Sequence, residues 1–302
     1  MQNINLALDW TPNINHIGFF VAEDQGFYRD ADLRVQILDP STDNYAVTPA
    51  KKLETGAADV ALCPTESLIS FRTKATPFPL VAIAALLQED LSAIAVSAAS
   101  GITTPKQLDG RSYASYQARY EDEIVRQMIR NDGGTGDLRL AYPDKLGIWD
   151  SLVNGTYDAT WVFRNWEGVE AEERGYDLRY FNLKDYGIPY SYSPVLATAE
   201  ATLAEREDVM RRFVAATKKG YQFTQENPGK SEGILERKLP AKDRHNNVKK
   251  ALGASVPYFG NPHTWGKMDE GRLQDFLDWL AAHRLETASL RAGDLFTNRL
   301  IQ

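Results

Sequence analysis

Leu8-Asp9-Trp10-Thr11-Pro12-Asn13-Ile14-Asn15-His16 is the most informative stretch of this chain of 302 residues. Apolar residues alternate before it, at Ile4, Leu6 and Leu8, which predicts a strand. The run 17–26 after it predicts a helix that Gly26 closes. We therefore expect a strand-to-helix turn at the carboxyl end of a strand, where α/β sheets bind ligands.

The side chains of this turn favour a ligand site. A turn that only reverses the chain commonly uses Gly, Ser or Pro, whereas a small-molecule site combines apolar surface with a few placed polar groups. This turn carries a carboxylate, an indole, an amide and an imidazole, and we expect Asp9, Trp10, Asn13 and His16 to face a ligand. The structural alternative places Trp10 in the core and makes Asn13 or Asn15 a helix cap.

Strands and helices alternate along most of the chain. Strands are predicted over 33–37, 59–63, 80–87, 91–96, 112–115 and 158–163. Helices are predicted over 50–55, 105–108, 120–131 and 146–153, and the C-terminal part is helical, with apolar stripes at 209–220 and 273–280. This alternation predicts right-handed crossovers and a mostly parallel sheet.

Two helix-to-strand connections are similar to each other. Gly56-Ala-Ala-Asp59 and Gly155-Thr-Tyr-Asp158 each link a helix end to a buried strand. Each strand then delivers polar residues from its carboxyl end, Thr65-Glu66 in one case and Asn165-Trp166-Glu167 in the other. We expect two lobes that face each other across a cleft, with these residues on its walls. A purely structural Glu167, placed at a helix N-terminus for its charge, is the alternative.

Two further loops carry candidate binding groups. The loop 113–119 leads from a strand into a helix, where backbone N–H groups of the Tyr116 turn and Arg119 could hold an anion or a carbonyl. A surface turn is the alternative there. The loop 185–194 contains three tyrosines, including Tyr190 and Tyr192. With the two tryptophans named above, their flat rings predict a slot for a planar ring, although packing alone accounts for one or two of them.

Composition excludes several classes of function. The hydrophobic share of 43% and the charged share of 25% are ordinary for a globular protein. The net charge of −7 disfavours nucleic acid as a partner. The single cysteine, Cys63, excludes an intrachain disulfide, and the four histidines lack the spacing of a metal site. GxSxG, P-loop and GxGxxG patterns are absent, so we predict a binding function without metal or cofactor.

Six segments occur together in an order and spacing that is similar to a known family. They are 9–16, 165–170, 185–194, 219–228, 265–269 and 295–298. The set resembles the NMT1/THI5-like, thiamin-pyrimidine precursor-binding proteins of ABC importers, whose ligands are formylaminopyrimidine or hydroxymethylpyrimidine compounds. The wider group also contains the fungal pyrimidine synthase of thiamin biosynthesis.

The resemblance implies a type 2 periplasmic-binding-protein fold. Two α/β lobes are then joined by two crossing strands, near Leu91–Ala95 and Pro194–Thr198, with the ligand in the cleft between them. Lobe 1 is expected to comprise residues 1–91 and 194–302, and lobe 2 residues 92–193. Binding is expected to draw the lobes together by hinge motion.

The resemblance also implies roles for the candidate residues. A planar aminopyrimidine is expected to stack on Trp10, Tyr190 and Tyr192, to bind Asn13 and His16 through polar contacts, and to give its amino group to Glu167. The facing walls are expected to contain Thr65, Glu66, Tyr116 and Arg119, with Asp9 and Trp166 in the same loops.

Two rival functions stay open. The pyrimidine synthase uses a lysine that binds pyridoxal phosphate, with a histidine nearby, in the loop after the third strand; here 62–68 reads Leu-Cys-Pro-Thr-Glu-Ser-Leu, with neither residue. Its cysteine-rich run also has no counterpart in 188–194. The other rival is a binder of sulfonate, nitrate or another small anion, for which Arg119 and Arg164 are the expected anchors.

Partner and compartment follow from the same resemblance. The expected partners are a pyrimidine ligand and the membrane subunit of an ABC importer, and a monomer is expected. No basic and apolar leader segment precedes the first strand. If Met1 is the native start, a cytoplasmic protein is expected; if a leader was removed, a periplasmic one.

Overall fold

The computed structural model describes residues 1–301, which divide into two compact units. Unit 1 comprises Met1–Asp90, Tyr192–Gly271 and Leu290–Gln302, and unit 2 comprises Leu91–Ser191 and Arg272–Ser289. Each unit is built around its own five-stranded mixed sheet with flanking helices. The chain therefore passes from one unit to the other four times, at residues 90–91, 191–192, 271–272 and 289–290.

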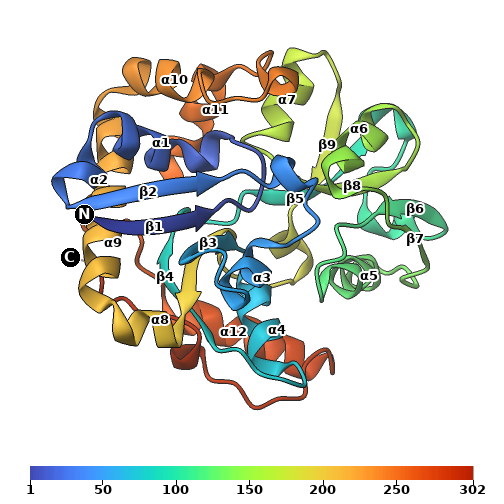
Figure 1. The fold of residues 1–302 in the computed structure, drawn as a ribbon. Helices are drawn as coiled ribbons and strands as arrows, with labels where there is room; N and C mark the ends of the chain where they lie inside the picture. The colour runs from blue at the N-terminus through green and yellow to red at the C-terminus, as the bar shows by residue number, and fades with distance from the viewer. Residues whose placement is uncertain (302) are drawn as a thin grey trace. The chain divides into compact units, whose positions relative to one another are not determined.

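The sheet of unit 1 has the strand order β2-β1-β3-β10-β4. The strands are β1 (Gln2–Ala7), β2 (Leu33–Leu38), β3 (Val60–Cys63), β4 (Leu80–Ala85) and β10 (Val195–Ala199). β1 runs parallel to both of its neighbours, and Figure 1 shows β1 and β2 side by side in blue. β10 runs antiparallel to both β3 and β4. The carboxyl ends of β1, β2 and β3 consequently meet at one edge.

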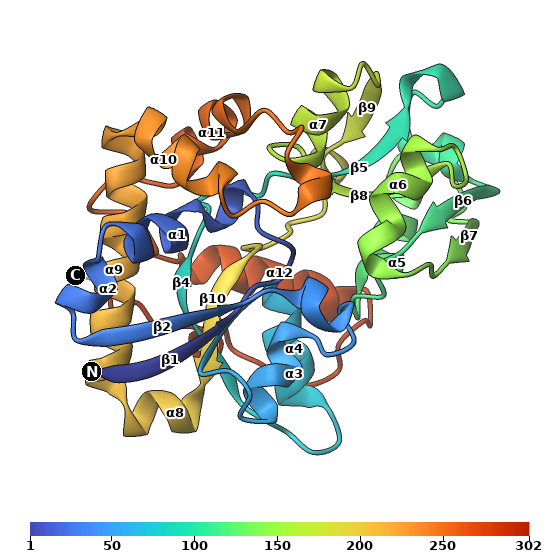
Figure 2. The ribbon, with the colours of Figure 1, turned by 45° about the horizontal axis from the view of Figure 1, so that its top comes forward.

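The helices of unit 1 are α1 (Ile17–Asp24), α2 (Phe27–Asp30), α3 (Pro49–Glu54), α4 (Thr65–Thr73), α8 (Glu200–Glu205), α9 (Glu207–Glu226), α10 (Pro228–Glu236) and α11 (Val248–Ser255). Figure 2 shows α1 beside the long helix α9, and their approach depends on two glycines. A Cβ on Gly220 would lie 2.0 Å from the carbonyl oxygen of Gly18, and one on Gly18 would lie 2.1 Å from the Tyr221 ring. Such close packing fixes the start of α1, and with it the turn before it.

The sheet of unit 2 has the order β7-β6-β8-β5-β9. Its strands are β5 (Ser92–Ser97), β6 (Arg111–Ala114), β7 (Leu138–Ala141), β8 (Ala159–Phe163) and β9 (Leu178–Phe181). β6 is parallel to β7 and β8, whereas β5 is antiparallel to β8 and β9. The helices are α5 (Glu121–Asn131), α6 (Ile148–Val153), α7 (Glu167–Glu173) and most of α12 (Glu270–Ala282).

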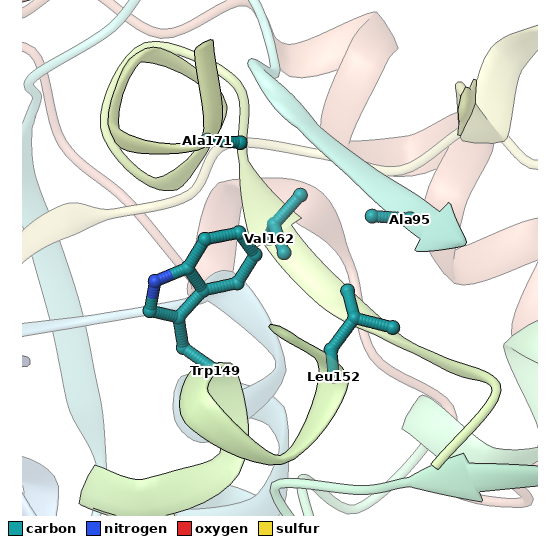
Figure 3. Packing of buried hydrophobic residues seen from close by; sticks show 5 residues of the cluster. All are labelled: Ala95, Trp149, Leu152, Val162 and Ala171. Carbon is teal, nitrogen blue, oxygen red and sulfur yellow. The ribbon is translucent and has the colours of Figure 1, made fainter. Parts of the chain in front are cut away.

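One part of the core of unit 2 is drawn in Figure 3. Trp149 and Leu152 of α6 pack on Val162 of β8, together with Ala95 of β5 and Ala171 of α7. The apolar side chains of α5 are also buried: Ile124, Val125, Met128 and Ile129. The short 3-10 helices of the chain are η1 (Ile14–His16), η2 (Pro40–Asp43), η3 (Ala98–Ser100), η4 (Pro105–Leu108), η5 (Lys145–Gly147), η6 (Leu183–Tyr186), η7 (Ala241–Asp243), η8 (Val256–Tyr258) and η9 (Ala292–Asp294).

The sequence prediction of a mostly parallel sheet needs correction. β5 and β10 are the first strands after the chain has entered a new unit, and both run antiparallel to their neighbours, which makes each sheet mixed. The lobe boundaries also differ from the expected ones at 272–289, because this segment packs in unit 2, where the Phe276 ring lies 5.4 Å from that of Tyr190.

Candidate functional site

The turn after β1 is held by a buried asparagine cap. The Asn13 side-chain oxygen accepts the backbone N–H of Asn15 at 2.9 Å, and its amide nitrogen donates to the carbonyl of Thr11 at 3.0 Å. From behind, the buried Tyr221 hydroxyl of α9 donates to the carbonyl of Asn15 at 2.5 Å. Asn13 is thus the helix cap that the structural alternative described, with both ends of its amide used within the turn.

His16 positions a neighbouring carboxylate. Its side chain is fully buried, its Nδ1 accepts the backbone N–H of Asn13 at 3.3 Å, and its Nε2 lies 2.7 Å from the Asp9 carboxylate. Because Nδ1 is the acceptor, we assign the ring proton to Nε2, which donates to Asp9. Both ring nitrogens are therefore engaged inside the turn, and a polar contact from His16 to the ligand stays a prediction.

Trp10 is the partly exposed aromatic side chain of this turn. Because it is partly exposed, Trp10 is not the core residue of the structural alternative. Its ring centroid lies 5.7 Å from that of Tyr45. Asn44 and Tyr45 both have positive φ, 50° and 59°, a conformation that costs non-glycine residues free energy and is often found at functional sites. Burial and the negative charge of Asp9 raise the pKa of Tyr45 above its usual value, which keeps the phenol protonated.

Sequence reasoning missed Tyr45. The signal available was its place in the loop after β2, because the carboxyl ends of β1 and β2 meet at the same edge of the sheet. Burial, with the charge of Asp9, also raises the pKa of the Cys63 thiol at the end of β3, so this cysteine is no activated nucleophile.

The start of α4 is hydrogen-bonded to Tyr192, which lies in the segment before β10. The backbone N–H and the hydroxyl of Thr65 both donate to the carbonyl of Tyr192, at 3.3 and 2.7 Å. The hydroxyl of Tyr192 accepts the backbone N–H of Asp269 at 2.9 Å. Thr65, Glu66 and Tyr192 are all buried in unit 1. Thr65 and Tyr192 thus have structural partners here that the sequence did not predict.

In unit 2, a carboxylate of the chain itself occupies the expected anion-binding turn. Glu121, the first residue of α5, is buried and accepts the backbone N–H groups of Tyr116 and Ala118 at 3.0 and 3.2 Å. It also accepts the hydroxyl of Tyr113 at 2.8 Å. The backbone groups that the sequence assigned to an anion are therefore bound to Glu121. An acidic residue in the first helical turn was the available signal for it.

Arg119 also has an internal carboxylate partner. Its guanidinium lies 2.8 Å from the carboxylate of Glu286, whose side chain is 6% exposed. The hydroxyl of Tyr120 donates to the same carboxylate at 2.7 Å. Glu286 follows α12, a segment more than 160 positions away in the sequence, so no local pattern could reveal this pair.

The remaining candidates of unit 2 lie around β8. Glu167 begins α7 and accepts the backbone N–H of Phe163 at 2.9 Å, and its side chain is largely buried, as is that of Trp166. The ring of Tyr190 meets those of Trp161 and Phe276 edge-on, at 5.1 and 5.4 Å. Glu167 thus has the structural role that the alternative described, in addition to any ligand contact.

The candidate residues are divided between the two units. Unit 1 contains Asp9, Trp10, Asn13, His16, Thr65, Glu66 and Tyr192, and unit 2 contains Tyr116, Arg119, Trp166, Glu167 and Tyr190. Within unit 1 the structure brings Asp9, Trp10 and His16 together with Tyr45. Residues 1–301 contain no cluster of three or more potential metal-ligating side chains of His, Cys, Asp or Glu. Among the same residues, no helix is long and apolar enough to span a membrane.

Comparison with known proteins places the chain in a family. The family model described as NMT1/THI5 like matches residues 13–231. The chain belongs to the NMT1/THI5-like family. A relative in Halalkalibacterium halodurans, named formylaminopyrimidine-binding protein, is 26% identical over 99% of this chain and 90% of its own length. A Legionella pneumophila relative, named 4-amino-5-hydroxymethyl-2-methylpyrimidine phosphate synthase, is 24% identical over 99% of this chain and 92% of its own.

The fold of this family member is confirmed by a solved structure. The periplasmic nitrate-binding protein NrtA from Synechocystis PCC 6803 matches with a TM-score of 0.74 at 11% identity, over 99% of this chain and 87% of the other. With the two mixed sheets described above, the chain has the type 2 periplasmic-binding-protein fold that the sequence predicted.

Proposed function

We propose that this protein binds a small planar aminopyrimidine precursor of thiamin, for uptake or for biosynthesis. A relative that matches this chain over nearly its whole length is named a formylaminopyrimidine-binding protein, which supports this ligand class. In the structure, the turn after β1 supplies a partly exposed indole and an oriented carboxylate. An aromatic face for the ring and an acceptor for the amino group are the two features that an aminopyrimidine needs.

The structure leads us to redistribute the roles in this proposal. Trp10 stacks on the ring, and Asp9, oriented by His16, accepts from the amino group. Glu167 stays a prediction as a carboxylate for the same group. Asn13 and His16 act by positioning, because their polar atoms are used within the turn. Glu66, Tyr116, Trp166 and Tyr190 stay predictions as ligand contacts. Closure of the two units over the ligand, a monomeric state and delivery to the membrane subunit of an ABC importer also stay predictions.

The observation that carries the choice of an amine over an anion is that the candidate anion-binding groups of unit 2 have partners within the protein. The N–H groups of the Tyr116 turn are bound to Glu121, and Arg119 is paired with Glu286. Arg164 donates to the side-chain oxygen of Asn182 at 3.1 Å. A sulfonate or nitrate would have to displace internal carboxylates from the first two, at a cost in binding free energy.

The alternative of a pyrimidine synthase needs a lysine after the third strand, and this chain has none there. β3 ends at Cys63 and α4 begins at Thr65, so this connection consists of Pro64 and contains no lysine that could form an imine with pyridoxal phosphate. No histidine follows within 64–68 either. The protein is therefore proposed as a binding protein, although several relatives are named synthases.

A ligand panel read by thermal unfolding tests the proposal. The panel contains 4-amino-5-hydroxymethyl-2-methylpyrimidine, formylaminopyrimidine, pyridoxal phosphate, an alkanesulfonate and nitrate. A ligand at 100 times its dissociation constant stabilises the folded state by about 2.7 kcal/mol. We expect the pyrimidines to raise the unfolding temperature of the protein. Trp10→Ala and Glu167→Gln should reduce this rise, and Arg119→Ala should leave it unchanged. A response to anions alone, lost in Arg119→Ala, would refute the proposal, and an imine absorbance with pyridoxal phosphate would revive the enzyme.

A further inference from the structure

Asn246 is a buried amide without a hydrogen-bond partner. It lies between η7 and α11, and its residue is 6% exposed. Its backbone N–H donates to the carbonyl of Asp243 at 3.0 Å. Among residues 1–301, however, no group hydrogen-bonds to its side-chain oxygen or to its side-chain nitrogen. Both ends of the amide are thus removed from water and unpaired.

Such a side chain destabilises the protein on its own. A buried donor or acceptor without a partner costs about 1–3 kcal/mol, and an apolar side chain of the same size avoids this cost. Buried polar groups in folded proteins are almost always satisfied, so an exception calls for an explanation. A ligand that provides one acceptor and one donor would satisfy both ends of this amide.

The loop that carries Asn246 lies against the turn after β1. The hydroxyl of Thr11 contacts the carboxylate of Asp243 at 3.4 Å. α11 packs against η1, and Figure 2 shows α11 in orange beside the blue segment that leads into α1. Both segments belong to unit 1. The loop that carries the unpaired amide therefore contacts the turn after β1 at Thr11, although it comes from a distant part of the chain.

We propose that Asn246 is a specificity residue that reads an edge of the ligand with an amino N–H beside a ring nitrogen. This inference rests on the proposed function and adds a residue to it. The side-chain nitrogen donates to the ring nitrogen, and the side-chain oxygen accepts from the amino group, as an asparagine pairs with the same edge of adenine. Nitrate and sulfonates offer acceptors alone, so they leave the side-chain oxygen unpaired and are disfavoured.

The test uses Asn246→Leu, which removes the amide and nearly keeps its volume. Wild type and variant are compared by chemical unfolding without ligand and by calorimetric titration with 4-amino-5-hydroxymethyl-2-methylpyrimidine. We expect Asn246→Leu to be more stable than wild type and to bind about 10- to 100-fold more weakly. A merely structural amide would not produce these opposite changes.

Ser231→Ala is the matched control. Ser231 of α10 is also fully buried in unit 1 with an unpaired hydroxyl. Its removal should leave affinity unchanged and stability equal or higher. Unchanged affinity of Asn246→Leu would overturn the inference, and so would a lower stability of this variant. If wild type itself binds no aminopyrimidine, the proposed function fails and takes the inference with it, a result that is visible before any variant is compared.

Discussion

Replacing Glu121 by alanine should destabilise the protein strongly and create a binding site for a small carboxylate. The buried carboxylate accepts hydrogen bonds from Tyr113, Tyr116 and Ala118. The phenol of Tyr113 is fully buried and loses its acceptor, which costs about 1–3 kcal/mol. The two backbone N–H groups are only partly buried and can reach water, at about 0.5–1.5 kcal/mol each. The expected loss is thus about 2–6 kcal/mol.

The assay is thermal and urea unfolding of Glu121→Ala in sodium formate and in sodium chloride at equal ionic strength. Formate can bind the vacated N–H groups, so it should restore part of the lost stability through binding to the folded state. Glu123→Ala is the control, because Glu123 is a partly exposed residue of the same helix that pairs with Arg126 at 3.3 Å and Arg130 at 3.5 Å. It should change stability by less than about 0.5 kcal/mol in either salt. A Glu121→Ala variant as stable as the control, or without any response to formate, would show that these N–H groups do not form an anion site.

Three further predictions concern packing, binding and pH. Gly220→Ala forces a Cβ onto a backbone carbonyl and should destabilise the folded protein by about 1–3 kcal/mol in urea unfolding. Gly253→Ala, in open space on α11, should stabilise it by up to about 1 kcal/mol. Equal effects of the two variants would contradict the packing described for α1 and α9. Trp10→Ala should weaken aminopyrimidine binding about 5- to 150-fold in calorimetric titration, with most affinity kept in Trp10→Phe, and equal affinity of all three proteins would exclude stacking. Burial opposes ionisation of Asp158, but hydrogen bonds from the hydroxyl and backbone N–H of Ser112 outweigh it and hold the pKa of Asp158 below its usual value. The contribution of Asp158 to stability is present above about pH 4 and is lost as the pH falls through the lowered pKa. Asp158→Asn should therefore reduce the loss of stability at acid pH, and an unchanged loss would contradict this.

Local pattern was sufficient for most of the fold. The strand before Asp9, the helix after His16 and the positive-φ glycines at Gly26, Gly56 and Gly155 all lie where the sequence placed them. Periodicity and glycine caps are short-range signals, so a single sequence displays them. β7 and β9 were missed, since each is short and carries charged residues on a sheet edge.

Long-range partners could not be predicted in this way. The residues next to Arg119 in the sequence do not predict its ion pair with Glu286. Those next to Asn15 do not predict that the Tyr221 hydroxyl donates to its carbonyl. The partners of His16 could not be predicted for the same reason, because its residue type is compatible with ligand contact and only the geometry shows both ring nitrogens engaged in the turn. The residue types of a site are therefore readable from sequence, whereas the atoms left for a ligand are decided by packing.

The most direct test is a crystal structure of the protein with 4-amino-5-hydroxymethyl-2-methylpyrimidine or formylaminopyrimidine bound. We expect the pyrimidine ring to lie in stacking distance of Trp10, with its amino group within hydrogen-bond distance of a carboxylate, Asp9 or Glu167. A ring bound away from Trp10, or an amino group without a carboxylate partner, would contradict the account.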